Sequence, residues 1–121
     1  MTGMRSFLLL RPARGRVPDV VGYYLKHGVL EAALPYGLIK GQILHPRHDP
    51  EDLLITSVWP DRAGYEAWRR APERAGLLDG LTPLLDGPEA VRAWTGRADA
   101  SPHDGYHPGR QLVVAHQIDA S

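Results

Sequence analysis

Residues 53–87 read LLITSVWPDRAGYEAWRRAPERAGLLDGLTPLLDG and contain the clearest structural signals of the chain. The segment begins inside a largely apolar run, residues 52–59. Apolar side chains on both faces of such a run are typical of a strand that is buried on both faces. Pro60 stops that run, and Asp61 is a residue type that caps the beginning of a helix. A strand followed directly by a helix is therefore predicted here.

The helix is predicted over residues 62–71, where Tyr65 and Trp68 are three apart and share one face. Pro72 is expected to start or kink a further helical piece, because proline is tolerated only in the first turn. This piece carries the leucines Leu77, Leu78, Leu81, Leu84 and Leu85.

Outside this segment, the pattern predicts one more helix and four more strands. The helix begins close to Pro18 and ends near Gly28. The strands are expected over residues 5–11, 36–45, 90–97 and 112–118. The order β-α-β-β-α-β with an extra C-terminal strand is that of an α+β, ferredoxin-like split βαβ with an antiparallel sheet. All 121 residues suit one domain.

The same pattern predicts a homodimer. Both crossover helices of this topology pack on one side of the sheet. Strands that are apolar on both faces then leave an apolar face open to water, and a partner surface usually covers such a patch. Two sheets packed face to face would form a dimeric α/β barrel.

Composition excludes several classes of protein. The 14 Lys and Arg residues balance 14 Asp and Glu residues, so the chain lacks the basic footprint of a nucleic-acid or anionic-membrane binder. No apolar run approaches the ~20 residues that cross a bilayer. The absence of Cys excludes disulfides and thiolate metal sites. We expect a cytoplasmic protein without nucleic-acid or membrane partners.

Four of the six histidines fall in two predicted loops. His45 and His48 lie in a turn between strands, and His103 and His107 lie in the polar, Gly- and Pro-rich loop 98–110. A metal site needs about three converging ligands, so no metal is expected. The long loop is a candidate lid that would bring His103 or His107 over a ligand as a general base.

Segment 53–87 resembles the antibiotic biosynthesis monooxygenase family of dimeric α/β barrels. The resemblance rests on the strand-end Trp59, the motif Tyr65-Glu66-Ala67-Trp68, the turn Ala71-Pro72 and the segment 81–85. It implies a tailoring enzyme of natural-product biosynthesis, which oxidises a polycyclic phenol to a quinone with O2 and without metal, flavin or other cofactor. It also implies that the C-terminal strand reaches across the dimer interface.

The resemblance and the residue pattern together give a set of candidate site residues. Trp59 and Tyr65 stand at the six-residue spacing of the quinone-forming members. The expected catalytic residues are Tyr65, His103 and His107. The expected substrate-binding residues are Trp59, Trp68, Tyr24 and Arg92, the last because a guanidinium beside an aromatic such as Trp94 can hold a phenolate or carboxylate.

One departure from the family pattern keeps other functions open. The quinone-forming members carry Asn four residues before the Trp, and this chain has Ile55 there and no Asn anywhere. A non-oxidative polyketide cyclase or isomerase on the same barrel is the first alternative, and a non-catalytic ligand-binding protein is the second. Haem degradation is least favoured, because it needs an Asn and a helix His that follows the Trp.

Overall fold

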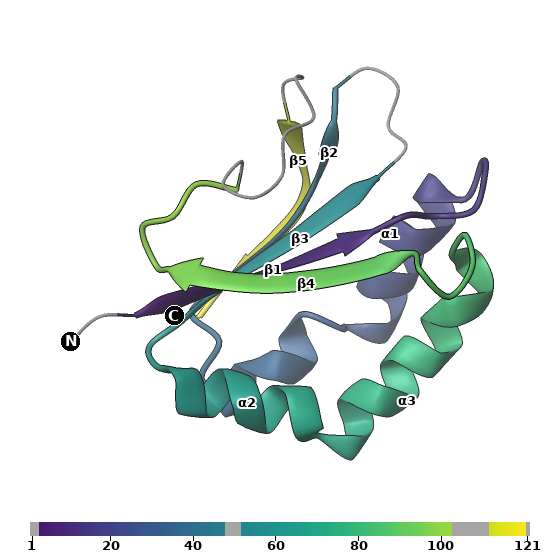
Figure 1. Ribbon diagram of the computed structural model, residues 1–121. Helices are drawn as coiled ribbons and strands as arrows, with labels where there is room; N and C mark the ends of the chain where they lie inside the picture. Colours follow the sequence, from purple (N-terminus) through teal and green to yellow (C-terminus); the bar gives the residue numbers. More distant parts are fainter. Residues whose placement is uncertain (1–2, 48–51, 103–111, 121) are drawn as a thin grey trace.

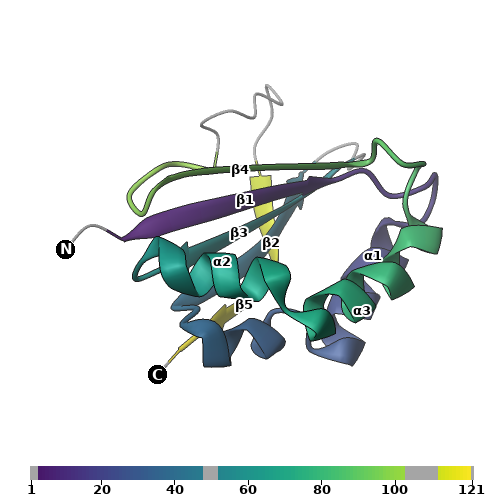
Figure 2. The ribbon, with the colours of Figure 1, turned by 60° about the horizontal axis from the view of Figure 1, so that its bottom comes forward.

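The computed structural model describes residues 3–47, 52–102 and 112–120. It shows an antiparallel sheet with helices packed on one of its faces (Figures 1 and 2). In chain order the elements are β1 Met4–Leu10, α1 Val17–His27, the 3-10 helix η1 Glu31–Tyr36, β2 Lys40–Pro46, β3 Leu53–Trp59, α2 Arg62–Arg70, α3 Pro72–Leu81, the 3-10 helix η2 Thr82–Leu84, β4 Val91–Arg97 and β5 Leu112–Asp119. None of the helices described is long and apolar enough to cross a membrane.

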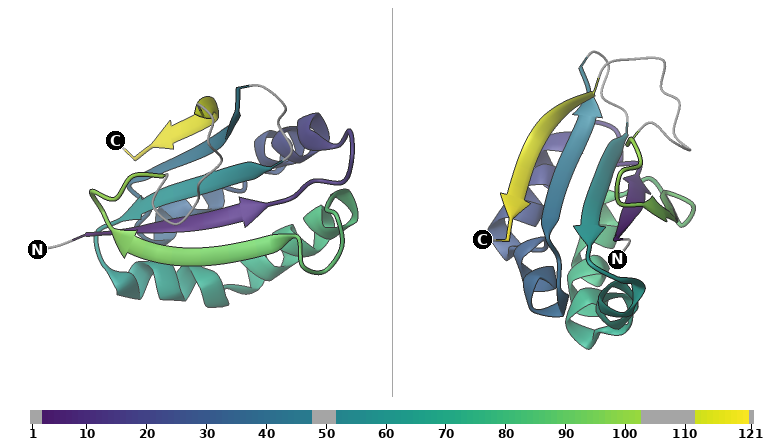
Figure 3. Two further views of the ribbon diagram at one scale, coloured as in Figure 1. Left: turned by 45° about the horizontal axis from the view of Figure 1, so that its top comes forward. Right: turned by 90° about the vertical axis from the view of Figure 1, so that its left-hand side faces the viewer.

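The strand order confirms the α+β, ferredoxin-like class. The sheet runs β4-β1-β3-β2-β5, and every neighbouring pair is antiparallel. The first four strands have the split βαβ arrangement, and the sheet does not close on itself. The extra C-terminal strand, β5, pairs with β2 of its own chain from Lys40↔Asp119 to Pro46↔Leu112 (Figure 3).

The helix ends follow from local chemistry. Pro18 lies in the first turn of α1, and Gly28 ends that helix in a left-handed conformation with φ of 58°. At the start of α2, the side chain of Asp61 accepts a hydrogen bond from the backbone N–H of Gly64. Pro72 begins α3 directly after α2, as predicted.

The strand predicted over residues 36–45 begins later than expected. Residues 31–36 form η1, and Gly37 ends it with φ of 106°, which favours glycine. Leu38, which follows this turn, is buried in the apolar cluster under η1 and α2. Ile39 still bonds to β3, because its N–H donates to the carbonyl of Val58 at 2.8 Å.

The helix face of the sheet holds two apolar clusters. One joins α1 to the sheet and includes Leu10, Val20, Ile43 and Leu53. The other lies under η1 and α2 and is made of Met4, Ala33, Leu38, Trp59, Tyr65, Trp68 and Ala71. The space between the two clusters holds the cavity described below.

The opposite face of the sheet, here called the back face, is less open than predicted. Its central cluster of Phe7, Leu9, Leu44 and Leu54 is only 1–7 % exposed within the single chain. After β4 the chain turns back (Figure 3). Ala100, in this turn, packs on the cluster and covers part of it.

The rest of the back face is partly polar rather than uniformly apolar. Arg5 donates to the hydroxyl of Thr56, and Gln117 links Gln42 to Asp119. On β5, Val114 remains 54 % exposed on this face.

Candidate functional site

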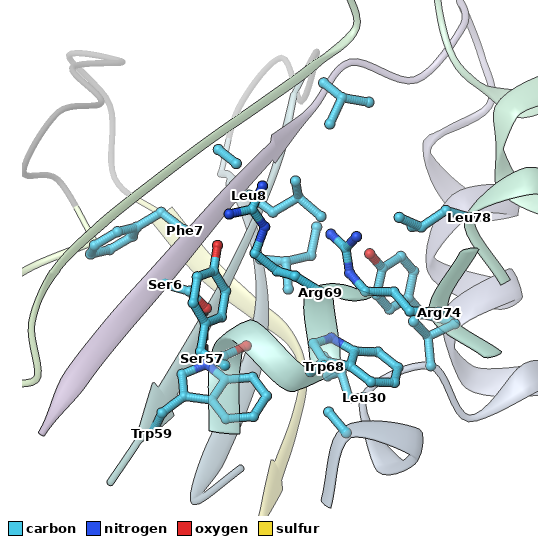
Figure 4. Close-up of a pocket in the computed structure, with 17 residues that line it drawn as sticks. Ser6, Phe7, Leu8, Leu30, Ser57, Trp59, Trp68, Arg69, Arg74 and Leu78 are labelled. Atoms are coloured by element: carbon cyan, nitrogen blue, oxygen red, sulfur yellow. Dashed lines mark hydrogen bonds between the residues drawn. The ribbon is translucent and has the colours of Figure 1, made fainter. Parts of the chain in front are cut away.

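A cavity of about 250 Å³ lies between the sheet and the helices. Its floor comes from β1, β3 and β4, and its walls come from α1, α2, α3 and the segment after α1. Ligand cavities commonly measure about 300–1,000 Å³, so this one suits a compact ligand. The described lining residues are Ser6, Phe7, Leu8, Tyr24, Val29, Leu30, Ala33, Ile55, Ser57, Trp59, Tyr65, Trp68, Arg69, Arg74, Leu78, Val91 and Ala93 (Figure 4).

Three aromatic side chains form one wall of the cavity. Trp59 ends β3, and its indole N–H donates to the hydroxyl of Ser6 on the neighbouring strand at 3.1 Å. The ring of Tyr65 meets Trp59 edge-on, with centroids 5.8 Å apart. Trp68 lies one turn further along α2 and packs against Tyr36, at a centroid distance of 5.5 Å. The wall is fixed by these contacts and presents flat apolar surface to a ligand.

Tyr24 brings a hydroxyl into the cavity from α1. The residue is 2 % exposed, and burial raises the pKa of its hydroxyl far above the usual value. No described residue forms a hydrogen bond with this hydroxyl. Its neighbour Tyr23 points away and donates to the carbonyl of Leu77 at 2.6 Å. Tyr24 is therefore a neutral hydroxyl at neutral pH, able to donate to a bound ligand.

Two arginines complete the lining. Arg69, from the last turn of α2, lies over the ring of Tyr65 with its guanidinium carbon 5.8 Å from the centroid. Arg74, in α3, is more deeply placed, and burial lowers the pKa of its guanidinium, an effect to which the charge of Arg69 adds. In Figure 4 both guanidinium groups point to the same side of the cavity.

The structure brings four of the predicted site residues together and separates one. Trp59, Tyr65, Trp68 and Tyr24 all line the cavity. Arg92 does not, because Val91 and Ala93 are the β4 residues that face it, and alternation places Arg92 on the back face. His103 and His107, like the rest of the predicted loop beyond residue 102, lie outside the described residues.

Four polar residues of the cavity were not predicted from the sequence: Ser6, Ser57, Arg69 and Arg74. Arg69 follows Trp68 and lies one turn after Tyr65, so its helical position was a usable signal. Because Arg is much more frequent than Lys throughout the chain, an arginine at this position did not stand out. On its strand, each serine lies between two large apolar residues of the same face. The sequence alone does not distinguish this pattern from that of an ordinary buried polar residue.

The position that departs from the family pattern also lies in the cavity. Ile55 is buried in its lining, so an apolar side chain occupies the place of the family's Asn. No histidine is among the lining residues that the structure describes. His116, on β5, has a buried Nε2 without a partner in the described chain, but it does not line the cavity. Within the described ranges, no three His, Cys, Asp or Glu side chains are grouped as metal ligands.

No family model matches the chain, and no curated protein matches it either. Solved structures do match. A conserved protein from Methanosarcina mazei aligns at a TM-score of 0.67 with 17 % identity, over 82 % of this chain and 95 % of its own. A candidate antibiotic biosynthesis monooxygenase from Chloroflexus aurantiacus gives a TM-score of 0.62 and 15 % identity, with the same coverage.

Another match is a mutant of SnoaB, a cofactor-independent oxygenase from Streptomyces nogalater. It aligns at a TM-score of 0.65 and 12 % identity, over 82 % of this chain and 95 % of its own. At such identities the likeness concerns the fold. The chain has the ferredoxin-like fold that antibiotic biosynthesis monooxygenase-like proteins share.

Proposed function

We propose that the protein is a small-molecule tailoring enzyme that oxidises a polycyclic phenol to a quinone with O2, without a cofactor. The observation that carries this proposal is that Trp59 and Tyr65, which stand at the spacing of the quinone-forming members, line one cavity whose lining is mostly apolar. A flat aromatic ligand would bury its rings against this wall. The likeness in fold to SnoaB supports the same class of reaction.

The reaction balances without a further reductant. An anthrone-like substrate loses a proton and becomes a phenolate, which is electron-rich enough to react with O2. One oxygen atom becomes the new carbonyl of the quinone, and the other leaves as water with the two hydrogens of the oxidised CH2 carbon. The protein has to bind the substrate, accept the proton and stabilise the anion.

We assign substrate binding, proton acceptance and stabilisation of the anion to different residues. Trp59 and Trp68 hold the rings, and the hydroxyls of Tyr65 and Tyr24 donate to the substrate oxygen. We assign the role of proton acceptor to His103 or His107, because a histidine of ordinary pKa, about 6.5, is suited to it. Arg92 is left out of this assignment, since it lies on the back face.

Oxygen uptake with anthrone tests the proposal. We expect O2 consumption coupled to anthraquinone formation at one to one, and a fall of about 10²-fold or more in His103→Ala or His107→Ala, the size typical of a lost general base. His27→Ala is the matched control, since His27 stacks on Tyr23 outside the cavity lining. Wild-type rates in both loop variants would reject histidine as the base, and no oxygen uptake would reject the oxidation.

A second candidate is a non-oxidative cyclase or isomerase acting on a polyketide. The buried Ile55 favours it, because a proton-moving reaction does not need the Asn that this position lacks. Conversion of a polyketone under anaerobic conditions would support it. Tight binding of a pigment without any turnover would instead indicate a ligand-binding protein.

We also propose that the protein acts as a homodimer. A structure with the same fold, from an uncultured marine organism, is described as a dimeric ferredoxin-like protein and aligns at a TM-score of 0.63 with 10 % identity. The back face of this chain would form the interface, through β5 and the strands beside it.

A further inference from the structure

The cavity has an unusual balance of charge. Two of its lining residues, Arg69 and Arg74, carry a positive charge, and none of the described lining residues is Asp or Glu. Arg69 pairs with the carboxylate of Glu66 at 3.6 Å, and Glu66 also pairs with Arg62 at 3.2 Å. This exposed contact, outside the cavity, does little to offset the charge inside.

Arg74 is the less compensated of the two. The structure shows no ion pair and no hydrogen bond for its guanidinium within the described chain, although the residue is partly buried. Partial burial of a cation without a partner costs free energy in a folded protein, because the charge loses part of its hydration. Such a group is commonly explained by a ligand that pairs with it when the site is filled.

The hydroxyls around the pair reinforce this environment. Tyr24 and Tyr65 both line the cavity and interact electrostatically with Arg74. The Tyr24 hydroxyl stays neutral and has no partner among the described residues, so it also remains available as a donor. The two guanidinium groups offer only donors of hydrogen bonds to a ligand in the cavity, and the two tyrosine hydroxyls can donate to it as well.

We infer that the ligand of this cavity is an aromatic anion whose carboxylate binds between Arg69 and Arg74. Its rings lie against Trp59 and the floor of Leu8 and Ile55. The inference rests on the proposed function only in taking this cavity as the substrate site. It narrows the substrate to a polycyclic phenol that also carries an acidic group.

A pair of fluorescent probes that differ in one group tests the inference. Anthracene-9-carboxylate is the anionic probe, and anthracene-9-methanol is its neutral counterpart. We expect the carboxylate to bind the wild-type chain at least tenfold more tightly, as charge-assisted hydrogen bonds to arginine would provide. Arg74→Gln and Arg69→Gln should each remove most of that preference while leaving the Kd of the neutral probe within about threefold.

The matched control is Arg70→Gln, which removes one positive charge from the same turn of α2 at an exposed position outside the cavity lining. The preference for the carboxylate should survive in this variant. A preference lost equally in all three variants would reflect net charge alone and would overturn the inference.

The outcomes separate this inference from the proposed oxidation. Equal affinity for both probes would overturn the anion site and leave the cavity and the oxidation standing. Binding of neither probe would overturn both. A strong, arginine-dependent preference without oxygen uptake from anthrone or its carboxylated derivative would support the anion site and reject the oxidation.

Discussion

Trp59 both stabilises the fold and lines the cavity. Its ring is fully buried at the end of β3, and its indole N–H bonds to Ser6 across the strand pair while its face borders the cavity. An unpaired buried donor or acceptor costs about 1–3 kcal/mol, so neither partner is easily removed alone.

This bond yields a double-mutant prediction. Ser6→Ala and Trp59→Phe should each lower the free energy of unfolding, Ser6→Ala by about 1–3 kcal/mol and Trp59→Phe by somewhat more because its ring is smaller. Combined, they should cost about 0.5–1.5 kcal/mol less than their sum, since the bond can be lost only once. Urea unfolding of the four proteins measures the difference, and strict additivity would show that the bond contributes nothing.

Because its hydroxyl is buried, Tyr24 makes the free energy of unfolding decrease as the pH rises through the alkaline range. In the unfolded chain its hydroxyl ionises near pH 10, whereas burial raises the pKa in the folded protein. The unfolded state therefore loses the proton first. Stability from this group is complete below about pH 9 and falls as the pH rises past 10, by up to about 1.4 kcal/mol per pH unit.

Tyr24→Phe removes this dependence without removing the ring. Urea unfolding from pH 8 to pH 11 should show the wild-type protein losing stability faster than the variant above pH 10. The two curves should run parallel below pH 9. Parallel curves over the whole range would mean that the hydroxyl is solvated in the folded state.

At the scale of the elements, α2 depends on a close approach to η1. A Cβ added to Gly64 would lie 2.3 Å from the carbonyl oxygen of Tyr36, a backbone atom that cannot move aside alone. Gly64→Ala should therefore lower the free energy of unfolding by about 1–3 kcal/mol. It should also weaken probe binding, because α2 carries Tyr65 and Trp68 into the cavity.

Gly76 provides the matched control. It lies inside α3, and a Cβ there would meet nothing within 4 Å. Gly76→Ala should stabilise the protein by about 0.5–1 kcal/mol through helix propensity and leave binding unchanged. Urea unfolding and fluorescence titration of both variants test the pair, and equal effects in the two would contradict the close approach.

The elements also show why the sequence predicts the fold better than the site. Strand alternation indicates that Arg92 and Trp94 share a face, but only the pairing of Ala93 with Leu8 decides that this face is turned away from the helices. The strand predicted from Tyr36 begins only at Lys40, because Tyr36 ends η1 and the left-handed Gly37 terminates that turn. Local patterns do not contain such long-range choices.

At the scale of the whole molecule, the residues of the back face that stay exposed in one chain decide which surface a dimer interface can use. The sequence suggested a fully apolar surface, yet its central cluster is already buried within one chain and polar pairs border it. A barrel built from two such sheets would therefore rely on the residues that remain accessible, and Val114 on β5 is the most exposed large apolar side chain among those described.

Sedimentation velocity tests this arrangement. We expect the wild-type protein to sediment as a dimer of two 13.4-kDa chains. Val114→Lys should weaken the dimer at least tenfold, because a lysine charge would have to be buried at the interface. Leu25→Lys is the matched control, since Leu25 is similarly exposed, at 49 %, but lies on α1 at the helix face. A wild-type monomer would contradict the dimer, and a dimer that Leu25→Lys breaks while Val114→Lys does not would place the interface on the helices instead.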